Sequence, residues 1–156
     1  MDKELLLKSH FHFIGIGGIG MSALAMGLIK KGCSVSGSDL VKNDETNKLE
    51  QLGAVIFTSQ VRQNIEFVIS KFTNKLINFV VSSAIKPENE EFSYCREKNL
   101  SIKHRSEILA MLMGTYTALA VAGSHGKTST STFLSTILEL CTRCLLYTSP
   151  SPRDDR

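Results

Sequence analysis

The sequence contains no tryptophan, only three prolines and four cysteines among 156 residues, and almost no excess of charge of one sign. The formal net charge is +3, and the longest same-sign runs are pairs such as Lys30 and Lys31, so no basic stripe suited to a nucleic-acid backbone is present. The cysteines are scattered without the framework of a secreted disulfide-rich domain, which favours reduced thiols in a cytosol. We therefore expect a cytoplasmic protein without a nucleic-acid partner.

Long hydrophobic runs are also missing. The leucine run at residues 5–7 is too short for the apolar region of a secretory signal, and no run approaches the length that spans a membrane. We expect no membrane partner. Cys141 and Cys144 have CxxC spacing but no second ligand pair, so neither a metal nor a redox role is predicted for them. The 42% hydrophobic content suffices for one core, and the length favours one domain plus part of another.

Apolar periodicity predicts alternating strands and helices along the first 114 residues. Residues 59–75 fit either a helix or a turn-rich connection, and we assign them to a helix. The β-α-β-α-β order predicts an α/β domain with a Rossmann-like parallel sheet and right-handed crossovers, spanning residues 1–114. Strands are expected at 10–16, 34–38, 54–57, 76–82 and 100–103, and the other helices at 21–29, 44–52, 87–98 and 108–113.

After Gly114 the pattern begins again, with a buried strand predicted at 118–122, a second glycine-rich loop, and a helix to about Leu140. A triphosphate-binding sheet needs several further strands, including one with an acidic magnesium partner, and the remaining chain is too short for them. We expect residues 115–144 to be the truncated start of a P-loop ATPase domain. Residues 145–156 lose all periodicity, and we interpret them as a non-native or disordered tail from adapter or vector sequence, which sequencing of the genomic locus would test.

The first glycine-rich loop, GIGGIG at residues 15–20, follows a predicted strand and opens a predicted helix. Gly15, Gly17 and Gly20 fit the G-x-G-x-x-G spacing of dinucleotide folds. Glycines let the backbone turn sharply and approach a diphosphate, while the N–H groups at the helix start supply donors. We predict phosphate or diphosphate binding here, the alternative being a purely structural tight turn.

Polar residues follow the predicted strands where ligands of open α/β folds bind. Asp39 ends the second predicted strand. Dinucleotide folds place at this position an acid that accepts hydrogen bonds from ribose hydroxyls, and the alternative is an aspartate that stabilises a turn. Ser82 and Ser83 close the apolar strand at 76–82, and their hydroxyls can donate hydrogen bonds to a phosphate or a sugar. The alternative is that one of them caps a helix. Arg105 precedes a helix start and suits a diphosphate, or else a surface ion pair.

His10 and His12 share one face of the first predicted strand because side chains alternate along a strand. No carboxylate lies near them in sequence, so we interpret them as partly exposed strand histidines rather than a metal pair.

The second loop, GSHGKT at residues 123–128, is a shortened relative of the triphosphate loop, because Val121 stands where that motif has its first glycine. A strand running into such a loop and then a helix supplies backbone donors for phosphates, a lysine for the β and γ oxygens, and a hydroxyl for Mg²⁺. We predict ATP and Mg²⁺ as ligands. His125 is assigned to loop architecture rather than to a catalytic base.

The segments HFIGIGGIGMS at residues 12–22, SSAIKP at 82–87 and AGSHGKT at 122–128 together resemble the Mur ligase family over about residues 10–140. The resemblance implies a Rossmann-like domain for a UDP-sugar, a central ATPase domain, and a C-terminal domain that helps hold an amino acid. The GIGGIGMS loop resembles that of the members that join L-alanine to UDP-N-acetylmuramate in peptidoglycan precursor synthesis.

The resemblance also implies a mechanism and a set of site residues. ATP phosphorylates the lactyl carboxylate of the UDP-sugar, and the amine of L-alanine displaces phosphate from the acyl phosphate. Lys127 and Thr128 would act in catalysis, with Thr128 on Mg²⁺. The implied ATP-binding residues are Gly123, Ser124, His125, Gly126, Lys127, Thr128 and Ser129. The implied UDP-sugar residues are Gly15, Gly17, Gly18, Ile19, Gly20, Met21, Asp39, Ser82, Ser83 and Arg105.

Residues that the family places downstream have no counterpart in the sequence, so we expect UDP-sugar binding without ligation from this chain alone. Two other classes remain open. An NAD(P)-dependent oxidoreductase fits the first loop and Asp39 but not Lys127 and Thr128, and NADH titration separates it from the ligase reading. A non-catalytic nucleotide-binding module requires a natural C-terminus, which the mass of the native protein would decide.

Overall fold

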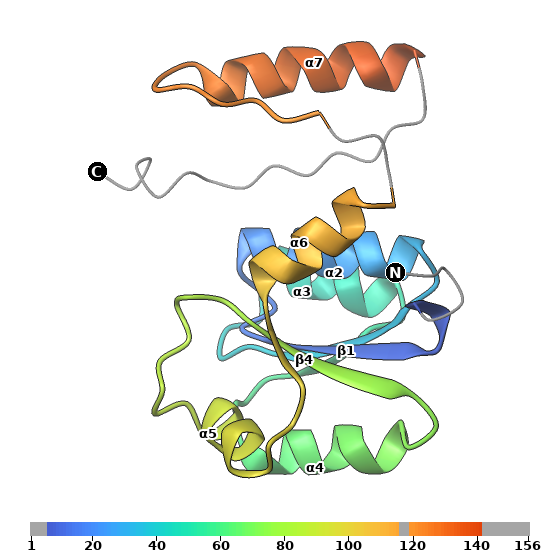
Figure 1. The fold of residues 1–156 in the computed structure, drawn as a ribbon, viewed down its shortest axis with the longest axis vertical. Helices are drawn as coiled ribbons and strands as arrows, with labels where there is room; N and C mark the ends of the chain where they lie inside the picture. Colours follow the sequence, from blue (N-terminus) through green and yellow to red (C-terminus); the bar gives the residue numbers. More distant parts are fainter. Residues whose placement is uncertain (1–5, 116–118, 142–156) are drawn as a thin grey trace.

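The computed structural model describes residues 6–115 and 119–141 and contains a five-stranded parallel sheet (Figure 1). The strand order is β3-β2-β1-β4-β5, which confirms the predicted Rossmann-like α/β fold. The longest strands, β1 and β4, pair in the middle of the sheet, and β1 is buried at every position. The strands are β1 (Ser9–Ile14), β2 (Ser34–Ser38), β3 (Val55–Phe57), β4 (Leu76–Val81) and β5 (Ile102–His104).

Helices cover both faces of the sheet (Figure 1). The upper layer consists of α2 (Ile19–Lys30), α3 (Asp44–Gln51) and α6 (Arg105–Met113). The lower layer consists of α4 (Arg62–Lys71) and α5 (Glu90–Glu97), so the segment predicted as helix or turns at 59–75 contains a helix. Consecutive crossovers therefore bury both faces, as a parallel sheet requires.

Two hydrophobic clusters fill the space between sheet and helices. In the upper cluster, Phe11 and Phe13 from β1 meet Leu24 and Leu28 from α2, all 1% exposed or less. The lower cluster is smaller and is built on Ile65, Val68, Phe79 and Cys95. Burying each side chain of this size contributes about 1.5–3 kcal/mol. The larger cluster lies beneath the helix that follows the first glycine-rich loop, so that helix start has a rigid support.

Helix α5 begins three residues later than predicted. Pro87 lies in a turn, and Asn89 is the N-cap, its side-chain oxygen accepting from the Phe92 amide at 3.0 Å. The asparagine cap satisfies one of the amides that a helix start leaves without an intrahelical partner. The two acids of the first turn, Glu90 and Glu91, are those that the sequence places there.

The strand predicted at 118–122 is wrong for the four residues that the structure describes, 119–122, which have no regular structure. A strand needs a hydrogen-bonded neighbour, and Leu119 is 61% exposed rather than buried in a sheet. The following helix, α7 (Lys127–Cys141), is confirmed. Residue 118, Cys144 and the tail at 145–156 lie outside the described residues. Within the described ranges, none of the helices combines the length and apolar character that crossing a bilayer requires.

Candidate functional site

The sheet reverses its direction of growth at β1, which pairs with β2 on one side and β4 on the other. The chain leaves β1 for α2 on the upper face and leaves β4 for α5 on the lower face (Figure 1). The two connecting loops therefore diverge at the carboxyl edge of the sheet, and open α/β folds bind ligands in the crevice between such loops. The predicted residues Gly15, Ser82 and Ser83 all lie in these two loops.

The first glycine loop is held by the end of β2. The amides of Gly15 and Ile16 both donate to the Ser38 carbonyl oxygen, at 2.8 and 3.0 Å. The Gly17 amide donates to Asp39 Oδ2 at 2.8 Å. Gly15 has a φ of +80°, a conformation that glycine adopts at no steric cost. Three successive amides are thus fixed, and the loop enters α2 in one defined conformation.

The space around the loop also requires glycine. A Cβ atom at Gly17 would lie 2.8 Å from Asp39 Oδ2 and 3.0 Å from Asn43 Nδ2. A Cβ atom at Gly15 would lie 3.1 Å from the Ile85 side chain, which belongs to the loop after β4. The side chain of Ile85 therefore lies within van der Waals reach of the first loop, and the two loops adjoin at the crevice.

Asp39 acts as an anchor of the loop. Its second oxygen accepts from the Val41 amide at 3.2 Å, so both carboxylate oxygens bind backbone. Asp39 therefore has the turn role that was one of its two predicted roles. The other role, a contact with ribose, stays a prediction. Asn43 was not predicted as part of the site. Its Nδ2 donates to the Gly17 carbonyl at 3.0 Å while its Oδ1 accepts from the Thr46 amide as N-cap of α3. An asparagine ahead of two acids is a helix-start signal, but its reach across to Gly17 has no signature in the sequence.

The other predicted residues lie along the same edge. Ser82 is partly buried and its carbonyl accepts from the Ile85 amide at 3.1 Å, whereas Ser83 is exposed. Neither serine caps α5, because Asn89 does. Arg105 follows β5 directly and opens α6, whose N-cap is His104. Ile19, Gly20 and Met21 form the first turn of α2 behind Gly18. The structure thus brings the predicted UDP-sugar residues to one edge of the sheet.

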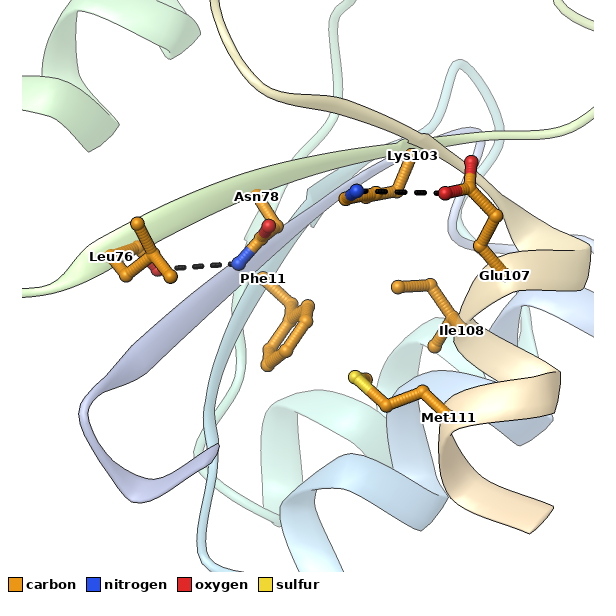
Figure 2. A pocket seen from close by; sticks show the side chains of 7 residues that line it. All are labelled: Phe11, Leu76, Asn78, Lys103, Glu107, Ile108 and Met111. Atoms are coloured by element: carbon orange, nitrogen blue, oxygen red, sulfur yellow. Dashed lines mark hydrogen bonds and ion pairs between the residues drawn. The ribbon is translucent and has the colours of Figure 1, made fainter. Parts of the chain in front are cut away.

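Two cavities flank the sheet. One, of about 350 Å³, lies beside the loop after β4 and is lined by Gln60, Ala84, Ile85, Lys86, Glu88 and Asn89. Asn89 Nδ2 donates to Gln60 Oε1 at 2.7 Å across it. The other, of about 180 Å³, lies between α6 and the sheet. Figure 2 shows Phe11, Ile108 and Met111 lining it and the Lys103–Glu107 ion pair, 3.5 Å between charged atoms, at its rim. Only the first cavity shares residues with a crevice loop.

The second glycine loop has fewer fixed contacts. Lys127 Nζ donates back to the Gly123 carbonyl at 3.1 Å, and His125 Nδ1 lies 3.3 Å from Ser124 Oγ. Gly126 has a φ of +75° and leads directly into α7. Thr128 and Ser129 are exposed in the first turn of that helix. A lysine folded over a loop at a helix start fits the chemistry of a phosphate site. Among the described residues, no group of three histidine, cysteine or acidic side chains could hold a metal ion.

His10 and His12 are not partly exposed, as the sequence predicted, but completely buried on the lower face of the sheet. The error has a physical cause, since their partners are serines of β2 that become neighbours only through strand pairing. His10 bonds Ser34 and Ser36, and His12 bonds Ser36. Burial lowers the pKa of His10 to about 3, with smaller contributions from His12, Lys75 and Lys71.

Comparisons with known proteins agree with the resemblance. The model of the Mur ligase family, catalytic domain, matches residues 10–117. A UDP-N-acetylmuramate–L-alanine ligase of Prochlorococcus marinus subsp. pastoris (strain CCMP1986 / NIES-2087 / MED4) is 70% identical over 142 residues, covering 91% of this chain and 30% of that protein. One of Synechococcus sp. (strain CC9605) is 46% identical over 138 residues, covering 88% and 29%. The chain thus spans about a third of the length of these relatives.

Solved structures show the same fold. A murein peptide ligase of Psychrobacter arcticus matches with a TM-score of 0.75 and 28% identity, covering 85% of this chain and 27% of that one. A UDP-N-acetylmuramate–alanine ligase of Thermotoga maritima matches with a TM-score of 0.70 and 28% identity, covering 83% and 29%. The matched family model covers more than half of the sequence and includes the glycine-loop crevice. The chain belongs to the Mur ligase family.

Proposed function

We propose that the crevice at the carboxyl edge of the sheet binds UDP-N-acetylmuramate, and that the whole protein joins L-alanine to its lactyl carboxylate at the expense of ATP. The observation that carries the proposal is the first glycine loop, whose backbone is fixed at the switch point of the sheet. A relative that is 70% identical to this chain over 142 residues is named UDP-N-acetylmuramate–L-alanine ligase, which supports this substrate.

The start of α2 suits a diphosphate. The helix begins at Ile19 behind Gly18, has no acidic residue in its first turn, and carries Lys30 in its last. Its N-terminus therefore carries the partial positive charge of the helix dipole, with no carboxylate in that turn to oppose an anion. Gly20 and Met21 stand in that first turn, and Arg105 at the far side of β4 adds a guanidinium that pairs with phosphate oxygens. Ser82 and Ser83 supply hydroxyls between these two groups.

The second loop is the proposed ATP site of the whole protein, comprising residues 123–129. When bound, ATP with Mg²⁺ supplies the phosphoryl group that turns an unreactive carboxylate into an acyl phosphate with a good leaving group. Lys127 would neutralise phosphate charge there, and the Thr128 hydroxyl would hold the magnesium ion. The loop backbone at Gly123 and Gly126 would lie against the phosphates. A cytoplasmic location is part of the proposal, since both small-molecule substrates and ATP are found there.

Calorimetric titration of the 156-residue chain with UDP-N-acetylmuramate tests the proposal. We expect saturable binding, and no phosphate release when ATP and L-alanine are added, because residues that the family places downstream have no counterpart in the sequence. Titration with NADH is the matched control. Tight NADH binding with no response to uridine nucleotides would assign the crevice to a nicotinamide coenzyme, and alanine-dependent turnover would refute the expected loss of ligation.

A further inference from the structure

A continuous row of polar side chains runs along the lower face of the sheet, on the side opposite α2. His10 Nδ1 lies 2.7 Å from Ser34 Oγ, and His10 Nε2 lies 2.8 Å from Ser36 Oγ. Ser36 Oγ lies 2.8 Å from His12 Nδ1, so this one hydroxyl joins the two rings. Both histidines are 0% exposed, and His10 stacks on Phe72 with ring centroids 3.6 Å apart. The row is therefore shielded from water and must be satisfied internally.

The far end of the row is the carboxylate of Glu91 on α5, also 0% exposed. Asn64 Nδ2 donates to its Oε1 at 2.7 Å, and the Ser38 hydroxyl donates to its Oε2. His12 Nε2 faces Oε1 at 3.8 Å, beyond hydrogen-bond length, and is the one buried side-chain polar atom without a hydrogen-bond partner in the described part of the chain. Three polar groups thus converge on one carboxylate with no lysine or arginine paired to it among the described residues.

The chemistry of these groups indicates which atom is the donor in each hydrogen bond of the row. A nitrogen lone pair aimed at a carboxylate would be repelled, so His12 Nε2 carries a proton, and in the neutral ring Nδ1 then accepts from Ser36. Ser36 has a single hydrogen, which it gives to His12, so it must accept from His10 Nε2–H. His10 Nδ1 then accepts from Ser34. In this arrangement each ring carries a proton on Nε2, and the low pKa of His10 agrees with a neutral His10 ring.

The row reaches the glycine loop through Ser38. The side chain of Ser38 donates to Glu91, while its backbone carbonyl accepts the amides of Gly15 and Ile16. Glu91 also lies in the first turn of α5, directly after the loop that contributes Ser82 and Ser83. One buried carboxylate therefore connects both loops of the crevice.

We infer that Glu91, held by hydrogen bonds from Asn64 and Ser38 and faced by His12 Nε2, is a positioning residue that fixes the glycine loop for its phosphate ligand. Its effect on ligand affinity rests on the proposed function, whereas its effect on the loop does not. Glu91 acts through Ser38 and need not touch the ligand.

The tautomers are measured first, on the unmodified chain, from the two-bond ¹H–¹⁵N couplings and ¹⁵N shifts of the histidine rings at pH 7. We expect the Nε2–H pattern for both His10 and His12. An Nδ1–H tautomer or a doubly protonated ring at either position would overturn this assignment of donors in the row.

The positioning role is tested with Glu91→Gln, which keeps the shape but replaces one acceptor oxygen by a donor. Amide hydrogen exchange of Gly15 and Ile16 should accelerate by about tenfold, and affinity for UDP-N-acetylmuramate should fall by a similar factor. Glu90→Gln changes the exposed neighbouring acid and should alter neither quantity. Unchanged exchange at Gly15 and Ile16 in Glu91→Gln would overturn the inference.

Ser38→Ala removes the hydroxyl that bonds Glu91 while leaving the backbone carbonyl in place. It tests the positioning role if Glu91→Gln does not fold. It should accelerate the same two amides, and exchange as in the unmodified chain would count against the inference. If the unmodified chain fails to bind UDP-N-acetylmuramate, the proposed function fails, but the exchange rates still decide whether Glu91 positions the loop.

Discussion

The two glycine-rich loops have similar compositions but very different surroundings. Around the first, Ser38 at the end of β2 and the following Asp39 supply acceptors for three successive amides, and a Cβ at Gly17 would collide with Asp39. Around the second, the described contacts come from within the loop and its own helix, and a Cβ at Gly126 would meet no atom within 4 Å in the described ranges. The difference shows that the first glycine-rich loop owes its shape to the neighbouring strand as much as to its glycines.

The helices that follow the loops repeat the contrast. Leu24 and Leu28 of α2 are 0% exposed against the sheet, whereas Phe133 and Ile137 of α7 are 72% and 57% exposed. Burial of apolar area is the main source of helix stability in proteins. In this chain the first loop is therefore supported by a packed domain, and substitutions around the two loops should have unequal effects.

The largest effect is expected from Gly37→Ala in β2. The new methyl group would lie 2.5 Å from Ile16 Cδ1 and 2.7 Å from the Phe13 carbonyl, where backbone has no room to move. We expect the free energy of unfolding to fall by about 3 kcal/mol, as overpacking of a core does. Urea denaturation followed by circular dichroism measures it. Gly126→Ala is the control, and equal losses in both variants would contradict the contrast between the loops.

A pH dependence should come from the buried His10 of β1, the strand that leads into the first loop. The folded pKa of His10, about 3, lies below its unfolded value of 6.5, so the unfolded chain takes up the proton first. The contribution to stability is complete above pH 6.5 and is lost as the pH falls toward 3, at about 1.4 kcal/mol per unit. Between pH 6.5 and 5 the free energy of unfolding should thus fall by about 2 kcal/mol.

Denaturation at pH values across that window measures the slope. The comparison variant is His125→Gln, at an exposed position in the second loop. His10→Gln should flatten the slope. A slope that survives in His10→Gln would contradict its assignment to His10.

Substitutions in the two loops should also differ in their effect on ligand affinity. Gly17→Ala forces the Asp39 carboxylate away from the loop, since the new Cβ would lie 2.8 Å from Oδ2. We expect the Kd for UDP-N-acetylmuramate to rise by about tenfold or more, the cost of one charge-assisted hydrogen bond. Gly123→Ala should leave that Kd unchanged, and calorimetry compares the two. A larger loss in Gly123→Ala would mean that the second loop holds the UDP-sugar.

The smallest effect is expected from Lys127→Ala. The lysine contacts the Gly123 carbonyl within its own loop, so its removal leaves the sheet and the first loop untouched. Stability and UDP-N-acetylmuramate affinity of this chain should both stay within error of the unmodified values, by denaturation and calorimetry. A loss in either would reveal a contact between the two loops.

Much of this arrangement could be predicted because it depends on local pattern. Strand β2 has its predicted bounds, and α2 ends near its predicted lysines, since apolar period and end signals act over a few residues. Burial of His10 and His12 could not be predicted, because Ser36 and Glu91 are remote in sequence and meet them only in the folded sheet. The strand expected at 118–122 failed for the converse reason. An apolar run predicts a strand only where a neighbour pairs with it.

The site shows the same division. The glycine loop and the edge where Ser82, Ser83 and Arg105 gather follow from the order of strands and helices. The anchoring of Gly17 by Asn43 does not, because that side chain already fits an ordinary helix cap and its second bond spans 26 residues. Tertiary hydrogen bonds of this kind leave no periodic trace.

The central claim is that the first loop alone, in this chain, receives the uridine nucleotide. Titration of the ¹⁵N-labelled chain with UDP-N-acetylmuramate, followed through its backbone amide signals, tests this most directly. The account predicts saturating shifts at the amides of residues 15–21 with those of residues 123–129 unmoved, and no comparable response to NADH. Shifts confined to the second loop, or a tight response of the first loop to NADH and none to the uridine nucleotide, would contradict it.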